Sequence, residues 1–222
     1  MKKYIILLGT FICSLSLYSQ TEKQNIQEFK LQITGQFLTT EGKDFYVIDC
    51  GGKAQNDLYN DFLVAITKLY VSPKTVIDKV ENRIITIKGF ESPAFSVNTE
   101  KKALDGTPIK SSYAVRYTLQ FQFKEGRIRV DAPVINAISK LIVGGVPGAT
   151  YEMPLWVSTE QLFLKENPQL TGKEKKDEKL IEKANRHNRV KENTCKAVNN
   201  FVNSIISKIV QDSIKPDKGS DW

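Results

Sequence analysis

The stretch SYAVRYTLQFQFKEGRIRVDAP, residues 112–133, decides the fold that the sequence predicts. From Tyr113 to Phe123 every second residue is large and apolar, and from Arg116 to Lys124 the residues between them are polar. Strict alternation of this kind is typical of a β-strand with one buried face. Glu125-Gly126 then predicts a two-residue hairpin turn, because glycine readily supplies the positive φ that such turns need. The stretch therefore predicts a hairpin with one apolar and one polar face.

The position of the turn also sets the register of this hairpin. The predicted cross-strand pairs are Phe123 with Ile128 and Phe121 with Val130 on the apolar face, and Gln122 with Arg129 and Gln120 with Asp131 on the polar face. One register thus satisfies both faces. Burial of one large apolar side chain contributes roughly 1.5–3 kcal/mol, so we expect the apolar face to be the centre of the core.

The N-terminus has the order of a secretory signal. Lys2 and Lys3 precede the apolar run 4–13, and small or polar residues follow up to Ser19. The run is too short for a membrane span, and no other stretch of the chain is long and apolar enough for one. Cys13 follows bulky residues, which does not favour lipid attachment. We expect cleavage near Ser19 and export to the periplasm or the medium.

The basic charge of the chain, formally +7, is concentrated near its C-terminal end. Residues 173–191 hold eight Lys or Arg and four Asp or Glu. Charge runs of mixed sign usually form a solvated helix face, which is the interpretation we favour. The alternative is a patch that binds an acidic surface.

Cys50 and Cys195 follow the predicted signal peptide. An oxidising compartment permits a disulfide between them. Both also fit as small buried residues, and sequence alone does not bring two Cα atoms within bonding reach. If the last helix covers the strand that ends at Cys50, the two thiols should lie near each other.

Apolar spacing and turn residues predict the elements before the hairpin. Asn56 or Asp57 is available to cap the helix of this region, and Asn82 suits a left-handed turn position. Two prolines, one glycine and many polar residues favour a loop at 90–112. The predicted elements are a weak edge strand within 26–38, a strand at 44–50, a helix near 56–70, two short strands at 76–77 and 84–87, and a long loop at 90–112.

Residues 134–164 are ambiguous, because 134–143 are apolar at helix-like spacing and Gly-rich residues 144–148 follow. We favour a segment packed over one end of the core. The alternative is a partner-facing or membrane-grazing flap that carries Trp156 and Phe163.

Residues 171–214 predict the closing helix. Thr171 and Glu174 have capping-box spacing, but one helix to Ile214 would be about 65 Å long. Only 193–214 carries a firm apolar stripe, so we expect the packing helix there and the charged part projecting or folded back.

The order of these elements resembles an uncharacterised family of secreted bacterial proteins with a fold like the TATA-box-binding protein (TBP). The segments that carry the resemblance are DLYNDFLVAITKLY (57–70), VIDKVENRIITIKG (76–89) and YTLQFQFKEGRIRV (117–130). The resemblance implies an α+β fold in which a curved antiparallel sheet has both helices on one face. It implies no activity, ligand or site residue.

With this resemblance the chain divides into six parts. We expect a signal peptide at 1–19, an N-terminal extension at 20–43, a TBP-like core at 44–134, an insertion at 135–170, a charged then amphipathic C-terminal helix at 171–215 and a tail at 216–222.

No catalytic constellation is present in the sequence. His187 is the single histidine and lies among charged residues, so we expect a surface position. One imidazole and two remaining thiols do not supply a zinc site, and the sequence has no phosphate-cradling glycine loop. We therefore predict no catalytic, cofactor-binding or metal-binding residues, and no cofactor.

The polar sheet face offers a further candidate interaction surface. TBP grips DNA with the comparable face and uses apolar wedges to do so. We find no aromatic wedge at the exposed strand positions here, so we expect no more than weak, salt-sensitive DNA binding. The candidate interaction residues are Arg116, Lys124, Arg127, Arg129 and Trp156.

Three functions remain open at this point. The one we favour is a non-catalytic binding or structural module of the bacterial envelope, whose partner is an envelope protein or an acidic surface. The second is a small-ligand or lipid carrier with a cavity under residues 134–164. The third is an enzyme with an unrecognised Asp/Arg site.

Overall fold

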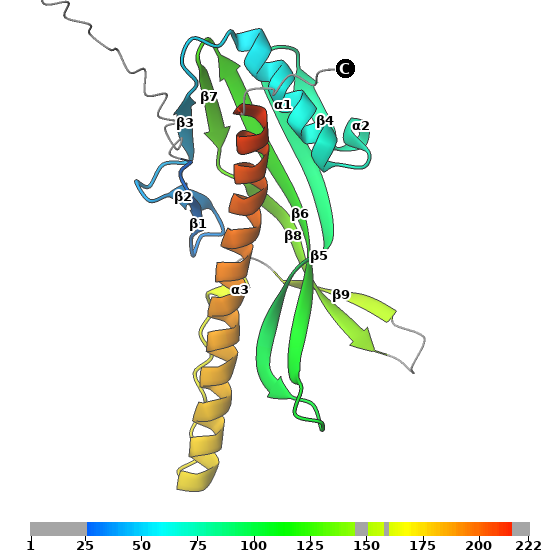
Figure 1. The fold of residues 1–222 in the computed structure, drawn as a ribbon. Helices are drawn as coiled ribbons and strands as arrows, with labels where there is room; N and C mark the ends of the chain where they lie inside the picture. Colours follow the sequence, from blue (N-terminus) through cyan, green and yellow to red (C-terminus); the bar gives the residue numbers. More distant parts are fainter. Residues whose placement is uncertain (1–25, 145–150, 158–159, 215–222) are drawn as a thin grey trace, which may run out of the picture.

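The computed structural model describes residues 26–144, 151–157 and 160–214, with the backbone alone at 141–144, 151–157 and 160 (Figure 1). The predicted signal peptide, Cys13 and the tail at 216–222 fall outside these residues. The strands are β1 (Phe29–Leu31), β2 (Phe37–Thr39), β3 (Phe45–Asp49), β4 (Ile77–Val80), β5 (Ile84–Lys102), β6 (Pro108–Lys124), β7 (Arg127–Asp131), β8 (Val134–Gly144) and β9 (Tyr151–Val157). The helices are α1 (Gln55–Leu69), the short α2 (Pro73–Val76), the 3-10 turn η1 (Glu160–Leu162) and α3 (Glu174–Ile214).

Seven strands of the described residues form one curved antiparallel sheet (Figure 1). Its main path is β3-β7-β6-β5-β4, and β8 pairs with the N-terminal half of β6 and with β9. Strands β7 and β8 lie along the same edge of β6, separated by Ala132 and Pro133. The predicted α+β class with an antiparallel sheet is confirmed.

The hairpin of β6 and β7 has the predicted register. Phe123 pairs with Ile128, Phe121 with Val130 and Gln122 with Arg129. Phe121 is fully buried. The turn residue Gly126 has φ +66°, and a Cβ there would lie 2.4 Å from the carbonyl oxygen of Gly51. Glycine is therefore required at this turn for its conformation and for the close approach of a second loop.

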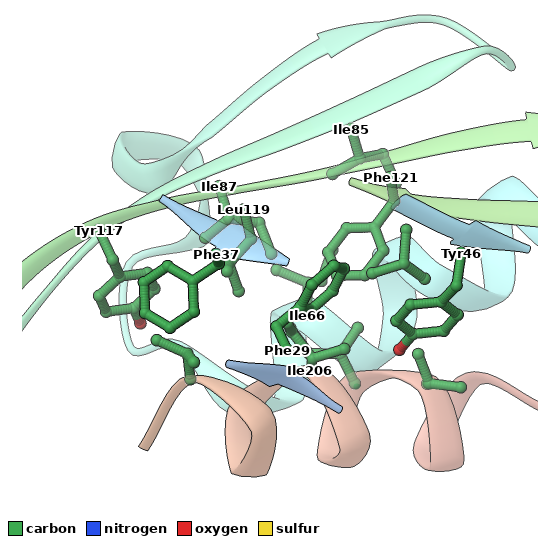
Figure 2. Packing of buried hydrophobic residues seen from close by; sticks show 14 of the residues in the cluster. Phe29, Phe37, Tyr46, Ile66, Ile85, Ile87, Tyr117, Leu119, Phe121 and Ile206 are labelled. Carbon is green, nitrogen blue, oxygen red and sulfur yellow. The ribbon is translucent and has the colours of Figure 1, made fainter. Parts of the chain in front are cut away.

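Both long helices cover the apolar face of the sheet (Figures 1 and 2). From α1, the ring of Phe62 packs 5.2 Å from that of Phe121 and 5.1 Å from that of Phe123, between centroids. From α3, the buried residues follow helical spacing, as the sequence predicts. They include Val198, Val202, Ile206, Ile209 and Val210.

The start of α1 is not capped by its own side chains, so the prediction of Asn56 or Asp57 as a cap is wrong. Instead, Glu125 of the hairpin turn accepts a hydrogen bond from the backbone N–H of Gln55 at 3.0 Å. A carboxylate at a helix N-terminus is favourable, because unpaired N–H groups and the helix dipole meet there. A contact with the β6–β7 turn thus replaces a cap by a neighbouring side chain of α1.

The prediction of a loop at 90–112 is wrong, because β5 and β6 run through most of it and pair across it. The strands turn only at 103–107, where Ala103 and Thr107 are hydrogen-bonded. Two register shifts, after Glu91 and after Asn98, absorb the irregular sequence. The outer half of this hairpin is polar on both faces, so the alternation that marks a half-buried strand is missing there.

Residues 134–143 also differ from the sequence-based interpretation. Their helix-like spacing is misleading, since the chain forms strand β8. β8 is hydrogen-bonded on both edges, to β6 and to β9, which fits a run of β-branched and apolar residues. The short strand predicted at 76–77 likewise begins only at Ile77, and Val76 ends α2. Asn82 does have the predicted left-handed conformation, with φ 57°.

Helix α3 is one unbroken helix of 41 residues, so the charged and apolar parts are continuous. The charged part projects beyond the packed end of the molecule (Figure 1). The hydroxyl and the backbone N–H of Thr171 both donate to Asp177, at 2.8 and 2.7 Å. Asp177 thus takes the role that the sequence assigned to Glu174.

The short strands β1 and β2 form a separate two-stranded sheet instead of adding an edge to the main one. They are tied to α3, where Asn203 bonds both the N–H and the carbonyl of Phe29 at 2.9 and 2.8 Å. Figure 2 shows Phe29 and Phe37 packed between the main sheet and α3. Both side chains are buried.

Candidate binding surface on the open face of the sheet

The face of the main sheet opposite α1 and α3 is uncovered among the described helices (Figure 1). We call it the open face. It is largely polar because the alternation of each strand points its apolar residues at the helices. It carries Phe45, Val47 and Asp49 of β3, Arg127, Arg129 and Asp131 of β7, Arg116, Thr118, Gln120, Gln122 and Lys124 of β6, Thr86, Lys88 and Phe90 of β5, and Asp78 and Val80 of β4.

Asp131 is the centre of a hydrogen-bonded network on the open face. Gln120 and Gln122 each donate an amide N–H to its Oδ2 at 2.8 Å, and Arg129 donates from Nε to its Oδ1 at 2.5 Å. The Asp131 side chain is 15% exposed. Three donors hold the carboxylate in one orientation, and two of them share one oxygen. Asp131 is thereby engaged as an acceptor, which leaves it little capacity to act as a general base.

A cavity of about 760 Å³ lies beside this network. It opens where β7 gives way to β8 at Ala132-Pro133, and the turns flanking β2 form its other wall. Polar lining residues include Thr118, Gln120 and Asp131. Small-ligand sites typically span about 300–1,000 Å³ and combine apolar walls with a few polar groups. The cavity has the size and the mixed lining of such a site.

Two of the predicted interaction residues stack on aromatic rings of the open face. The guanidinium carbon of Arg129 lies 4.0 Å from the ring centroid of Phe45, and that of Arg116 lies 5.4 Å from that of Phe90. Both distances are within cation–π range. The guanidinium group of each arginine is therefore in contact with an aromatic ring of the adjacent strand.

The other predicted residues are more scattered. Lys124 and Arg127 are exposed and face each other across the hairpin, next to Asp49 of β3 in the register. Trp156 lies in β9 opposite Ser139, and its side chain is outside the described residues. The structure thus brings Arg116, Lys124, Arg127 and Arg129 onto one face without making one basic cluster.

The prediction that the open face lacks an aromatic is wrong. Phe90 is 58% exposed there, and Val47, Val80 and Val134 are at least half exposed. A signal for Phe90 was present in the sequence, because Ile85 and Ile87 alternate with Thr86, Lys88 and Phe90. The assumption of a loop from residue 90 concealed it. The hairpin register placed Gln120 opposite Asp131, but the further bonds from Gln122 and Arg129 to Asp131 were not predicted.

Metal-ligating side chains and thiols are the next candidates for chemistry among the described residues. No three His, Cys, Asp or Glu side chains among them lie close enough together to hold a metal ion. Cys50 and Cys195 are free thiols, so the possible disulfide is not formed. Burial raises the pKa of each thiol to about 11, which keeps both protonated and weakly nucleophilic at neutral pH.

His187 is half-exposed and pairs with Glu166, at 2.7 Å between Nδ1 and Oε2. Within the same described ranges, no helix combines the length and apolar character needed to cross a membrane.

Neither a protein-family model nor a curated protein sequence matches the chain. Two solved structures are similar in arrangement. A DUF4468 family protein from Bacteroides ovatus is 14% identical, with a TM-score of 0.43 over 78% of this chain and 86% of that one. A TBP-like protein from Parabacteroides distasonis is 11% identical, with a TM-score of 0.45 over 78% of this chain and 92% of that one. Their names agree with the resemblance stated from the sequence, and we take no function from them.

Proposed function

We propose that the protein is an exported, non-catalytic binding module of the bacterial envelope, and that its open face binds a polar ligand. The observation that carries this proposal is the 760 Å³ cavity beside the Asp131 network. Its amides, hydroxyl and guanidinium lie on paired strands, which hold them in fixed positions without a ligand. Preorganised polar groups of this kind lower the entropy lost on binding.

Export is supported by the charged, apolar, small-residue order of residues 2–19. Expression of the full chain in a Gram-negative host tests it. We expect the protein in the periplasmic fraction with Gln20 at its N-terminus. An unprocessed chain in the cytoplasm contradicts the envelope role.

Catalysis by an Asp/Arg site is disfavoured because the carboxylate of Asp131 already accepts hydrogen bonds from three donors, of which Arg129 is one. One observation favours the alternative function, a small-ligand or lipid carrier. A crevice of about 500 Å³ lies between β1, residues 162–165 and α3, and Leu31, Leu162 and Phe163 line it. Its lining is more apolar than that of the open-face cavity, so the crevice would bind a hydrophobic ligand.

Chemical-shift mapping with soluble peptidoglycan fragments tests the open face, since these fragments carry amides, hydroxyls and carboxylates. We expect the shifts to cluster on β3, β6 and β7. The Thr118 hydroxyl donates to Oδ1 of Asn136 at 2.9 Å and can still accept a hydrogen bond from a ligand. Thr118→Val should weaken binding about tenfold if that bond to the ligand is lost. The matched control is Thr67→Val on the exposed side of α1. Shifts along α3 near Leu162 favour the carrier, and no shifts at all contradict the proposal.

DNA is the alternative ligand of this face, since Phe90 is an exposed aromatic there. Four basic residues supply few phosphate contacts, so we expect weak binding that disappears near physiological salt. Tight, salt-resistant binding that depends on Arg127 and Arg129 would instead establish a nucleic-acid function.

A further inference from the structure

A second cavity, of about 610 Å³, lies far from the Asp131 network, between the outer half of the β5–β6 hairpin and the charged half of α3. The proposed function makes no use of it. We call it the arm cavity. Its lining is Thr99, Lys101, Ile109, Lys110, Ser111, Ser112, Lys140, Glu166, His187, Val190 and Lys191. Five separate segments of the chain therefore contribute: β5, β6, β8, the connection between η1 and α3, and α3 itself.

Hydrogen bonds and ion pairs hold the walls of the arm cavity together. Arg189 of α3 makes a two-pronged contact with the carboxylate of Glu100, with N–O distances of 2.6 to 3.0 Å. Asn188 bonds the backbone N–H and carbonyl of Glu166 at 2.8 and 3.1 Å, and Lys191 donates to the carbonyl of Leu164 at 2.7 Å. These contacts fix the helix against both neighbouring segments. The shape of the cavity thus depends on contacts between segments that are distant in the sequence.

The backbone at Glu100 is strained in a way that serves this arrangement. Glu100 has φ 57°, a left-handed conformation that a non-glycine residue rarely adopts. It lies in the irregularity between Asn98 and Lys101, where the register of β5 on β6 shifts. The shift lets Glu100 reach Arg189, while Thr99 and Lys101 still line the cavity. Strained backbone conformations persist where surrounding contacts hold them, and they cluster at functional sites.

The charge of the arm cavity is strongly positive. Lys101, Lys110 and Lys140 line it and form no ion pair with any carboxylate of the described residues. The one carboxylate in the lining, Glu166, is already paired with His187 at 2.7 Å and lies 3.5 Å from Lys191.

Glu100 does not offset this charge either. The hydrogen bond from Arg189, followed by the charges of Arg189 and Arg186, lowers the pKa of Glu100. Its negative charge is thus engaged by Arg189, and the lysines remain uncompensated.

The lining also supplies neutral groups suited to an oxyanion. Thr99, Ser111 and Ser112 bring hydroxyls, and Ile109 and Val190 give the cavity apolar surface. A lysine ammonium binds phosphate oxygens as a point charge and needs no planar, bidentate geometry, and neighbouring hydroxyls can donate to the remaining oxygens. Arg189, on the adjoining part of α3, is committed to Glu100. Three uncompensated lysines from different strands require more than one anionic group on the ligand.

From this geometry we propose that the arm cavity binds a small polyanion that carries two or more phosphate groups. Two sources share this chemistry, a soluble phosphorylated molecule and the headgroup of an anionic phospholipid. Inorganic triphosphate is the soluble probe. Vesicles of phosphatidylcholine, with and without phosphatidylglycerol, are the lipid probe.

Calorimetric titration of the full chain with triphosphate tests the proposal. We expect one site per chain, with affinity that falls as salt screens the lysines. Lys110→Gln/Lys140→Gln should weaken binding by at least about tenfold, since each lysine lost removes a charge-assisted contact. Because Lys140 is half-buried, Lys101→Gln/Lys110→Gln is a second variant in which both changes are exposed.

The matched control is Lys74→Gln/Lys79→Gln, which removes the same charge from exposed positions on α2 and β4. It should bind triphosphate as the parent does. Binding to phosphatidylglycerol vesicles that triphosphate displaces identifies a lipid headgroup as the source, and triphosphate binding without vesicle binding identifies a soluble ligand. No binding of triphosphate, or equal losses in the cavity and control variants, overturns the proposal.

Discussion

The two ends of the β5–β6 hairpin have the same strands but are held in place by different forces. At one end, which we call the head, Ile85, Ile87 and Phe121 are fully buried beneath α1 and α3. At the other end, the arm (residues 94–112), most side chains are exposed. Val97 and Phe95 still pack against the core at its base, and a bidentate ion pair from Glu100 to Arg189 ties its outer part to α3. Burial of large apolar groups contributes far more to stability than exposed ion pairs do. The head therefore stabilises the fold, and the arm is free to present charge.

This division explains why both cavities lie outside the packed region. The open-face cavity lies on the uncovered side of the sheet, and the arm cavity lies beyond the apolar stripe of α3. Polar groups in either place remain near water, so their desolvation penalty is small when no ligand is bound. The head supplies the rigid support that such sites need.

The largest expected effect separates two phenylalanines on opposite faces of the head. Phe121→Ala should lower the free energy of unfolding by about 3–5 kcal/mol, because the ring is fully buried. Phe90→Ala should lower it by no more than about 1 kcal/mol, since the ring is exposed and loses only its contact with Arg116. Urea titrations of both variants measure the difference. Equal effects would mean that the two faces of the sheet are assigned incorrectly.

A smaller effect is expected at the β6–β7 turn, which contacts the loop before α1, and Gly42 in the β2–β3 turn is the comparison. Gly42→Ala should cost about 1–2 kcal/mol, because φ is +77° there and nothing lies within 4 Å of a Cβ. Gly126→Ala should cost more than this, since its Cβ would also meet the Gly51 carbonyl at 2.4 Å. Thermal unfolding of the two variants makes the comparison. If Gly42→Ala is the more damaging, the hairpin turn does not dock against the start of α1 as described.

The sequence predicted the head well and the arm poorly, for one physical reason. Alternation at 113–124 reports a face buried by other elements, and it correctly predicted the register of Phe123 on Ile128. The outer part of the arm has no such face, so Pro, Gly and polar residues there resembled a loop although the backbone is paired.

The candidate sites were harder to predict for a related reason. Arg116 and Arg129 were identified from strand alternation. The hairpin register predicted Gln120 opposite Asp131, whereas Glu125 as a cap and the lysines of the arm cavity depend on contacts between distant segments. Local spacing carries no signal for them.

Acid should loosen the arm before the head. Hydrogen bonds from Arg189 and His187 lower the pKa of Glu100 and Glu166, respectively, from the ordinary 4.5. A lowered carboxyl pKa stabilises the folded form above pH 4.5, and this contribution is lost as the pH falls through the lowered pKa. Backbone NMR spectra recorded between pH 6 and pH 3 should therefore show residues 98–101 and 186–191 changing first.

The variant Glu100→Gln removes one of the two titrating contacts. Its arm should be looser at pH 6 and should change less on acidification than that of the parent. Glu41→Gln, which changes an exposed carboxylate near β2, is the control. An arm that responds to acid in the same way in all three proteins contradicts the role of Glu100.

Residue-resolved hydrogen exchange, measured in rising urea with and without inorganic triphosphate, tests the contrast between head and arm most directly. Without triphosphate, amides of Leu119, Phe121 and Ile128 should exchange only by global unfolding, and paired arm amides such as Lys110 and Ser111 by local opening that urea hardly affects. Triphosphate should slow exchange in the arm more than in the head. Exchange of arm and head through the same global opening, with no selective protection of the arm by triphosphate, would contradict the account.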